Sequence, residues 1–283
     1  MVQVIDTHCH YNMEPLYSGK KSHFRLNDDE PILSMTWQQH WHNAQQKEVG
    51  GGVVVGANME SSLKAVEIAS LEPKLIAAIG IHPHEAEAKP LAEYEQFLTK
   101  LLPNNNIKAI GETGLDYFRL NKNTSEFHQT KQAQHQLFAL QIKLAKQQQL
   151  PLIIHVRDDQ ELAYWETLDI LKQHHDADLK FVLHCVSGPT KYVEEALTLG
   201  AYLGFDGNIS YKNTDDLKKI LKATPQDKIL IETDAPYLPP QGYRGQICEP
   251  WMVTEVAKFI TENFEVDLDQ VLTNTKKFFS YQF

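Results

Sequence analysis

The sequence predicts an α/β protein with eight parallel strands closed into a (β/α)8 TIM barrel. Two observations carry this prediction. Short runs rich in β-branched and aliphatic residues alternate with longer stretches of helical periodicity. Polar residues suited to metal binding close several of these runs, including the first and the last. The chain has 283 residues, 42% of them hydrophobic, which suffices for one barrel of about 250 residues.

The expected strands follow one another at fairly regular intervals along the chain. Most are short, as is typical of strands that are buried on both faces. Their order, with helical stretches between them, predicts a parallel sheet. The eight ranges are Val2–Cys9, Gly52–Ala57, Leu75–Gly80, Ile107–Glu112, Leu152–Val156, Phe181–Cys185, Ala201–Phe205 and Ile229–Asp234.

Helices are expected where apolar residues recur at helical spacing. These stretches are Trp37–Lys47, Ser61–Ser70, Ser125–Gln149, Gln160–His174 and Glu249–Asn263. The aromatic-rich tail, residues 278–283, is expected to pack a terminal helix onto the barrel.

An open, doubly wound sheet is the structural alternative to a barrel. The barrel is favoured because candidate ligands on the first and last strands would have to meet. The sequence contains no internal repeat and no evident linker. Residues 1–283 are therefore expected to form a single domain.

The composition limits the classes of function. Lys and Arg number 27 and Asp and Glu 37, for a net charge of −10. This balance argues against a protein that coats nucleic acid nonspecifically, because such binding depends on neutralising phosphates. It does not exclude a nuclease, since bound metals can supply positive charge locally. No membrane span or signal peptide is expected, and three scattered cysteines indicate a reducing cytoplasm.

The first predicted strand ends in a candidate metal-binding pair. Strand side chains alternate between two faces, so His8 and His10 share a face and Cys9 points away. Two imidazoles at one strand end can chelate one metal ion. By itself the pair is equally consistent with two hydrogen-bonded core histidines.

Further candidates close four other predicted strands. Glu112 ends an apolar run, where an unpaired buried carboxylate would be costly. His155 precedes Arg157 by two residues, His184 closes the sixth strand, and Glu232 and Asp234 share a face of the eighth. Imidazoles and carboxylates together suit Zn, Mn, Fe, Co or Ni, with Mg possible at an oxygen-rich position. Six ligands are more than one tetrahedral zinc needs, so two metals with a bridging carboxylate fit better.

An ordered set of motifs resembles the TatD family of metal-dependent deoxyribonucleases. The match is colinear and covers nearly the whole chain. It comprises Asp6-Thr7-His8-Cys9-His10, Ile81-His82-Pro83-His84, Gly111-Glu112-Thr113-Gly114-Leu115-Asp116, Ile154-His155-Val156-Arg157, His184-Cys185-Val186-Ser187-Gly188, Glu232-Thr233-Asp234-Ala235-Pro236-Tyr237-Leu238, Arg244-Gly245 and Glu249-Pro250.

The resemblance implies a division of the ligands between two divalent ions, Mg, Mn or Zn. His8, His10 and Asp234 would hold one ion, and His155 and His184 would hold the other. It implies that Glu112 bridges the two.

Residues around these ligands carry further expectations. Asp6 and Glu232 are candidates to orient ligand imidazoles, with structural hydrogen bonding as the equal alternative. The resemblance implies that His82 lies by the substrate and contacts phosphate, with a general-acid role as the alternative.

Two arginines are candidate phosphate clamps. A guanidinium group can hold phosphate oxygens in bidentate fashion, which suits Arg157 and Arg244. For Arg157, an ion pair with Asp116 is the competing interpretation.

The implied activity is 3′ to 5′ exonucleolytic cleavage of DNA, especially at single-stranded ends. A metal-activated water would attack phosphorus, with Asp234 taking its proton; Asp234, Glu112 and His82 are the catalytic candidates. Two alternatives remain open on the same centre: an amidohydrolase, or a deacylase of D-aminoacyl-tRNA. A binding protein that has lost catalysis is disfavoured because every candidate ligand is present. A monomer is expected.

The segment from Tyr11 to Thr36 departs from the family pattern, in which the first helix follows the first strand quickly. It includes Tyr17, Lys20, Lys21, His23, Phe24 and Arg25. Basic and aromatic residues together could contact phosphates and stack on bases. A surface insertion without a substrate role is the favoured interpretation, since an acidic run, residues 27–30, offsets much of the charge.

Overall fold

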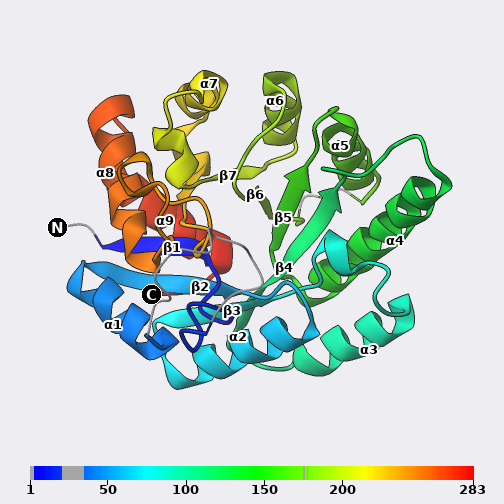
Figure 1. Cartoon of the computed structure of the whole chain (residues 1–283), viewed down its shortest axis with the longest axis horizontal. Coiled ribbons are helices and arrows are strands. Elements are labelled where there is room, and N and C mark those ends of the chain that lie inside the picture. The colour runs from blue at the N-terminus through cyan, green and yellow to red at the C-terminus, as the bar shows by residue number, and fades with distance from the viewer. Residues whose placement is uncertain (1–2, 21–34, 175, 177) are drawn as a thin grey trace.

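Each strand of the protein pairs in parallel with the next strand along the chain. The computed structural model describes residues 3–20, 35–174, 176 and 178–283. In these residues the strand order is β1 through β8 in one sheet, ringed by helices (Figure 1). The strands are β1 (Val4–Cys9), β2 (Val49–Val55), β3 (Leu75–Ile79), β4 (Ile107–Asp116), β5 (Leu152–Arg157), β6 (Phe181–Leu183), β7 (Tyr202–Phe205) and β8 (Ile229–Ile231).

Helices connect consecutive strands and cover the outside of the sheet. They are α1 (Trp37–Gln46), α2 (Met59–Leu71), α3 (Leu91–Leu101), α4 (Ser125–Gln148), α5 (Leu162–His174), α6 (Thr190–Thr198), α7 (Asp215–Ala223), α8 (Val253–Phe264) and α9 (Leu268–Phe279). Within the described residues, no helix is both long and apolar enough to cross a membrane.

The sheet closes where β1 meets the chain that follows β8. Cys9 and Ala235 form a parallel bridge. The amide of His10 donates to the Ala235 carbonyl at 2.8 Å, and the Asp234 amide donates to the His8 carbonyl at 2.8 Å. These bonds confirm the predicted barrel over the open sheet.

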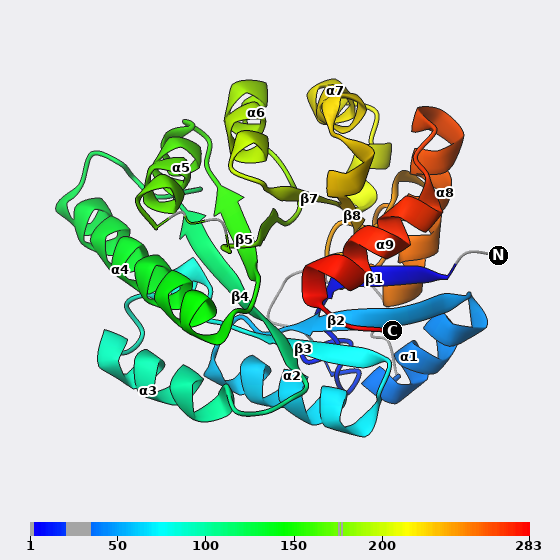
Figure 2. The same ribbon diagram turned by 180° about the vertical axis from the view of Figure 1, so that it is seen from behind.

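The interior of the barrel is a small apolar core of its own. Strand residues of one parity face inward, as the period of two requires. The inward set is Val53, Val55, Ile76, Ala78, Ala109, Ile153, Val182, Tyr202 and Leu230. Phe278 and Phe279 of α9 join this core, and α9 packs against β1 and β8 (Figure 2). The predicted packing of the aromatic tail onto the barrel is therefore confirmed.

An irregularity in β4 turns Glu112 into the barrel. Ile110 pairs with Leu152 and Thr113 with Ile154, so β4 advances three residues while β5 advances two. This extra residue is a β-bulge, which reverses the inward and outward parity beyond it. Ala109 faces inward before the bulge, and Glu112 faces inward after it.

Several predicted boundaries are wrong in ways that affect the site. β4 continues to Asp116, so Glu112 lies within the strand rather than at its end. β6 ends at Leu183 and β8 at Ile231, which places His184 and Asp234 in the following loops. Helices α3, α6 and α7 lie outside the stretches that were predicted to be helical.

The long segment after β1 is only partly described. Lys21, His23, Phe24 and Arg25 lie outside the described residues. Of the others, Tyr11 and Leu16 are buried in the main core.

The aromatic tail is predicted to contribute strongly to stability. Phe278→Ala would empty a fully buried site at the base of the barrel, and we expect it to lower the free energy of unfolding by about 3–5 kcal/mol. Leu71→Ala, at a side chain that is 64% exposed, is the control and should change it by less than about 0.5 kcal/mol. Urea denaturation of both variants measures the difference, and equal midpoints would contradict the packing.

Candidate metal centre

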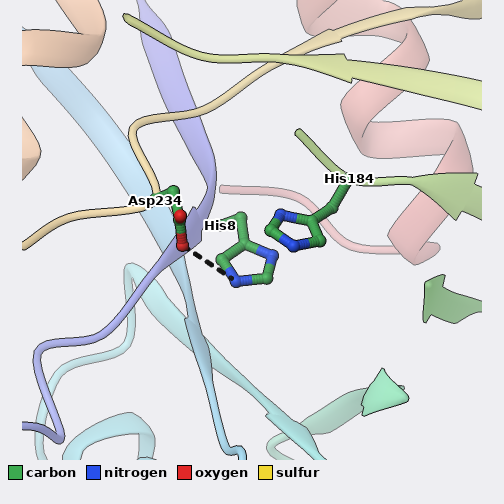
Figure 3. Close-up of side chains that lie close together, drawn as sticks. All are labelled: His8, His184 and Asp234. Atoms are coloured by element: carbon green, nitrogen blue, oxygen red, sulfur yellow. Dashed lines mark ion pairs between the residues drawn. The ribbon is translucent and has the colours of Figure 1, made fainter. Parts of the chain in front are cut away.

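His8 of β1 and His10, which directly follows β1, converge on one point with Asp234. The Nε2 atoms of His8 and His10 lie 3.2 Å apart. Asp234 Oδ1 lies 3.6 Å from His8 Nε2 and 3.3 Å from His10 Nε2. Figure 3 shows the Asp234 carboxylate directed toward His8, with the His184 ring stacked on the other side of His8 at 3.9 Å between centroids.

A second pair of imidazoles converges beside the first. His155 Nδ1 lies 3.3 Å from His184 Nε2. The far nitrogen of each ring faces a carboxylate: His155 Nε2 lies 3.1 Å from Asp116 Oδ2, and His184 Nδ1 lies 3.3 Å from Glu232 Oε1. The hydrogen bond to Asp116 fixes the tautomer of His155 that directs the lone pair of Nδ1 inward.

Glu112 lies between the two pairs and offers one oxygen to each. Its Oε2 is 3.7 Å from His8 Nε2 and 3.9 Å from His10 Nε2. Its Oε1 is 2.8 Å from His155 Nδ1 and 3.0 Å from His184 Nε2. A carboxylate placed in this way can bridge two ions.

The donors fit a pair of divalent ions. The backbone carbonyl of Val55 can only accept, so His10 donates from Nδ1 at 2.8 Å, and in the neutral form of the ring Nε2 carries a lone pair. That lone pair faces His8 Nε2 at 3.2 Å. A cation held between the two Nε2 atoms would bind to both. Neutral imidazoles with carboxylates suit first-row divalent metals.

The histidines and carboxylates of the cluster shift one another's pKa values. Burial alone would raise the pKa of Glu112, but His184, His82 and His155 hold that pKa well below its ordinary value. Burial would lower the pKa of His184, but Glu112 and Glu232 raise it well above the ordinary value. The pKa of His155 is raised by Asp116 and Glu112 against the opposing effect of burial. In the absence of metal, protons would therefore occupy the second pair.

His82 borders the second pair rather than joining a ligand pair. Its Nε2 lies 3.7 Å from Glu112 Oε1, and its ring stands edge-on to His155 at 4.4 Å between centroids. Its Nδ1 accepts from the His84 amide at 3.1 Å, so Nε2 carries the proton. Burial, with His155, lowers the pKa of His82 well below its ordinary value. His82 is thus a neutral donor facing the centre.

The two carboxylates expected to orient imidazoles differ in role. Glu232 faces His184 as expected and also accepts from the Cys185 amide at 2.6 Å. Asp6 instead accepts from the Thr233 hydroxyl at 2.6 Å and the Thr233 amide at 3.0 Å. It contacts no ligand imidazole among the described side chains, so the structural alternative holds for Asp6.

Asp116 is a functional candidate that the sequence analysis did not assign to the site. It was considered only as an ion-pair partner of Arg157, and that interpretation is wrong. Its Oδ2 lies 3.1 Å from His155 Nε2 and 3.0 Å from His84 Nε2. The available signal was its spacing of four residues from Glu112, which places both on one face of a strand.

The two predicted phosphate clamps lie at the rim of the same end of the barrel. Arg157 ends β5 and Arg244 follows β8, and both are exposed. Arg157 lies over the Phe118 ring and Arg244 over the Tyr211 ring. Within the described residues, neither guanidinium group forms an ion pair with a carboxylate of the metal-binding cluster.

A cavity of about 500 Å³ opens between the loops after β6 and β7 and helix α7. It begins two residues beyond His184 and contains none of the six ligand candidates. Its lining comprises Val186, Ser187, Gly188, Asn208, Asn213, Thr214, Asp215, Asp216, Leu217 and Ile220.

Comparison with known proteins places the chain in one family. Residues 5–283 match the family model described as TatD related DNase. The metal-dependent hydrolase YabD of Bacillus subtilis is 32% identical over 273 residues, covering 96% of this chain and 95% of its own. The metal-dependent hydrolase YcfH of Escherichia coli is 28% identical over 91% of this chain and 86% of its own. The crystal structure of YJJV, a TatD homologue from Escherichia coli, superposes with a TM-score of 0.83 at 26% identity and covers 99% of each chain.

The barrel, its cluster of histidines and carboxylates and these relatives define a metal-dependent hydrolase. The chain belongs to the TatD-related DNase family.

Metal affinity is predicted to fall with decreasing pH. Protonated imidazoles cannot bind metal, and the raised pKa values of His155 and His184 let protons compete above the ordinary value of about 6.5. Each competing proton should weaken binding about tenfold per pH unit. Calorimetric titration with Mn²⁺ between pH 8 and pH 6 measures the slope, and a Kd independent of pH would contradict it.

The support of His184 by Glu232 is predicted to be sensitive to Gly204. A Cβ at Gly204 would lie 2.5 Å from Glu232 Oε2, so Gly204→Ala should displace the carboxylate. We expect metal affinity to fall about 10- to 100-fold. Gly242→Ala, where a Cβ would meet nothing within 4 Å, is the matched control. Equal affinities in both variants would show that Glu232 does not support the site.

Proposed function

We propose that this protein is a two-metal phosphodiesterase that removes nucleotides from single-stranded ends of DNA in the 3′ to 5′ direction. The observation that carries the two-metal part is the position of Glu112, with one oxygen toward each histidine pair. The DNA part rests on the family, whose model is described as TatD related DNase.

Two bound ions would supply Lewis acidity toward a phosphodiester and would lower the pKa of water. In the proposed reaction Asp234 accepts the proton of the attacking water. Its side chain is 13% exposed, so it can reach both the ligand cluster and solvent. The positive φ of Asp234, 56°, turns the chain after β8, and this left-handed conformation is one that Asp tolerates better than most residues.

His82 and the rim arginines would position the phosphate groups. His82 presents a neutral Nε2–H toward the centre, which suits a hydrogen bond to a phosphate oxygen. Arg157 and Arg244 lie further out, where they would contact flanking phosphates. We further propose that the protein works in the cytoplasm as a monomer, which light scattering of the purified protein would test.

The same centre could hydrolyse an amide or an acyl-tRNA ester. No described contact favours these substrates over a phosphodiester, so they are outcomes of the test below.

Removal of either central carboxylate is predicted to abolish DNA cleavage. Glu112→Ala removes the bridging ligand and Asp234→Ala removes a ligand and the proton acceptor. Loss of a ligand should exceed the 10- to 100-fold effect typical of its outer partners. The measurement is nucleotide release from end-labelled single-stranded and duplex DNA, after metal stripping and addition of Mg²⁺, Mn²⁺ or Zn²⁺.

Glu95→Ala, which removes a surface carboxylate of α3 paired with Lys143, is the control and should cleave normally. The order of products gives the polarity. If metal-loaded wild-type protein cleaves no DNA with any ion, the nuclease proposal fails and amide or acyl-tRNA hydrolysis takes its place.

A further inference from the structure

Every arginine in the described residues lies at the catalytic end of the barrel. The chain has four arginines against 23 lysines. Arg119 follows β4, Arg157 ends β5 and Arg244 follows β8, while Arg25 lies outside the described residues. The carboxyl ends of barrel strands carry the active site. The distribution therefore concentrates guanidinium groups around the metal centre of an otherwise acidic protein.

The first two arginines form a cluster with one aromatic ring. The guanidinium carbon of Arg157 lies 4.1 Å from the Phe118 ring centroid, and that of Arg119 lies 5.0 Å from it. Both arginines are exposed, and Phe118 is half-buried. We call Phe118, Arg119 and Arg157 the β4–β5 cluster.

The β4–β5 cluster is held in place and has unbalanced charge. The Phe118 amide donates to Asp116 Oδ1 at 2.9 Å, and Asp116 Oδ2 faces the ligand His155. The Tyr117 amide donates to the Arg157 carbonyl at 2.9 Å. Within the described chain, neither guanidinium forms an ion pair with a carboxylate. Two like charges that share one ring repel each other, and an anion bound between them would relieve this repulsion.

A second, smaller cluster lies at the same end of the barrel, in the loops after β7 and β8. The guanidinium carbon of Arg244 lies 4.6 Å from the Tyr211 ring centroid. The Tyr211 hydroxyl donates to the Pro239 carbonyl at 2.9 Å, which fixes the ring against the loop after β8. No ion pair with a described carboxylate involves Arg244 either. Tyr211 and Arg244 form the β7–β8 cluster.

The two clusters flank the metal centre on different sides. β6, which leads to the ligand His184, separates β5 from β7 in the sheet (Figure 1). The β4–β5 cluster adjoins the His155 side through Asp116, and the β7–β8 cluster lies in the loops around Asp234. Since β5 carries His155 and the chain after β8 carries Asp234, a ligand that contacts both clusters would lie at the end of the barrel that holds these two residues.

From this arrangement we propose that the β4–β5 and β7–β8 clusters form a cradle that holds a single strand of nucleic acid of several nucleotides across the metal centre. Guanidinium groups would pair with the phosphates on each side, and Phe118 and Tyr211 would stack on bases. A small ester or a lone phosphate could occupy one cluster but could not bridge both. This inference rests on the proposed phosphodiesterase function and names residues for strand binding, Phe118, Arg119 and Tyr211, beyond the two clamps.

Binding of an uncleavable strand tests the cradle separately from turnover. The probes are fluorescent single-stranded phosphorothioate oligonucleotides of 2, 6 and 12 nucleotides, measured by anisotropy with the metal-loaded protein over a range of salt concentrations. The variants are Arg119→Gln, Phe118→Leu and Tyr211→Leu. The matched control is Lys108→Gln, because Lys108 also lies over an aromatic ring, that of Tyr281, but at the start of β4 and so at the opposite end of the barrel.

We expect affinity to rise with length up to a strand that spans both clusters. Phe118→Leu and Tyr211→Leu should each weaken the 12-mer by about 5- to 100-fold. Arg119→Gln should weaken it and reduce the slope of log K against log salt by about 0.7. Lys108→Gln should bind as wild type does.

Two results would overturn the cradle while leaving the nuclease intact: a dinucleotide that binds as tightly as the 12-mer, or cluster variants that match Lys108→Gln while wild-type protein still cleaves DNA. If wild-type protein neither binds nor cleaves any strand, the proposed function fails and the cradle fails with it.

Discussion

A carboxylate buried at the centre of the barrel among four imidazoles is the constraint on which the site depends. Glu112 is 4% exposed, and a buried charge is tolerated only when it is paired or bound to metal. Its two oxygens face two histidine pairs, His8 and His10 at the end of β1, and His155 of β5 with His184 after β6. The bulge in β4 is what directs Glu112 inward, since strict alternation after Ala109 would have sent its side chain toward the helices. Gly111 permits this, because a Cβ there would lie 2.6 Å from Ile153 Cβ.

The contact that closes the barrel also brings two of the metal ligands together. The ligands His8 and Asp234 reach each other only where β1 meets the chain after β8, and the Asp234 amide bonds to the His8 carbonyl. Asp6 strengthens this seam through Thr233, and burial raises the pKa of Asp6 to about 8. The aromatic tail fills the opposite end, beneath the inward-facing core. Stability and chemistry therefore occupy opposite ends of one barrel, as in other proteins of this architecture.

The sequence predicted what alternation and chain order determine. Short buried strands with polar residues after them gave the barrel, and His8, His10, His155, His184 and Asp234 do converge with Glu112. It could not show a one-residue bulge, because a bulge is visible only against the partner strand. For that reason the predicted strand ended at Glu112 although β4 continues to Asp116, and Asp116 was not predicted to be part of the site. The two alternatives for Asp6 stayed open because sequence spacing does not reveal that Thr233, 227 residues later, lies beside it.

The central claim is that Glu112 joins two metal sites, and a crystal of the Mn²⁺-loaded protein tests it most directly. The anomalous difference map should contain two peaks about 3.5–4 Å apart. One peak should lie beside His8, His10 and Asp234 and the other beside His155 and His184, with one Glu112 oxygen bound to each. A single peak at full occupancy under saturating metal, or two peaks that Glu112 does not contact, would contradict the account.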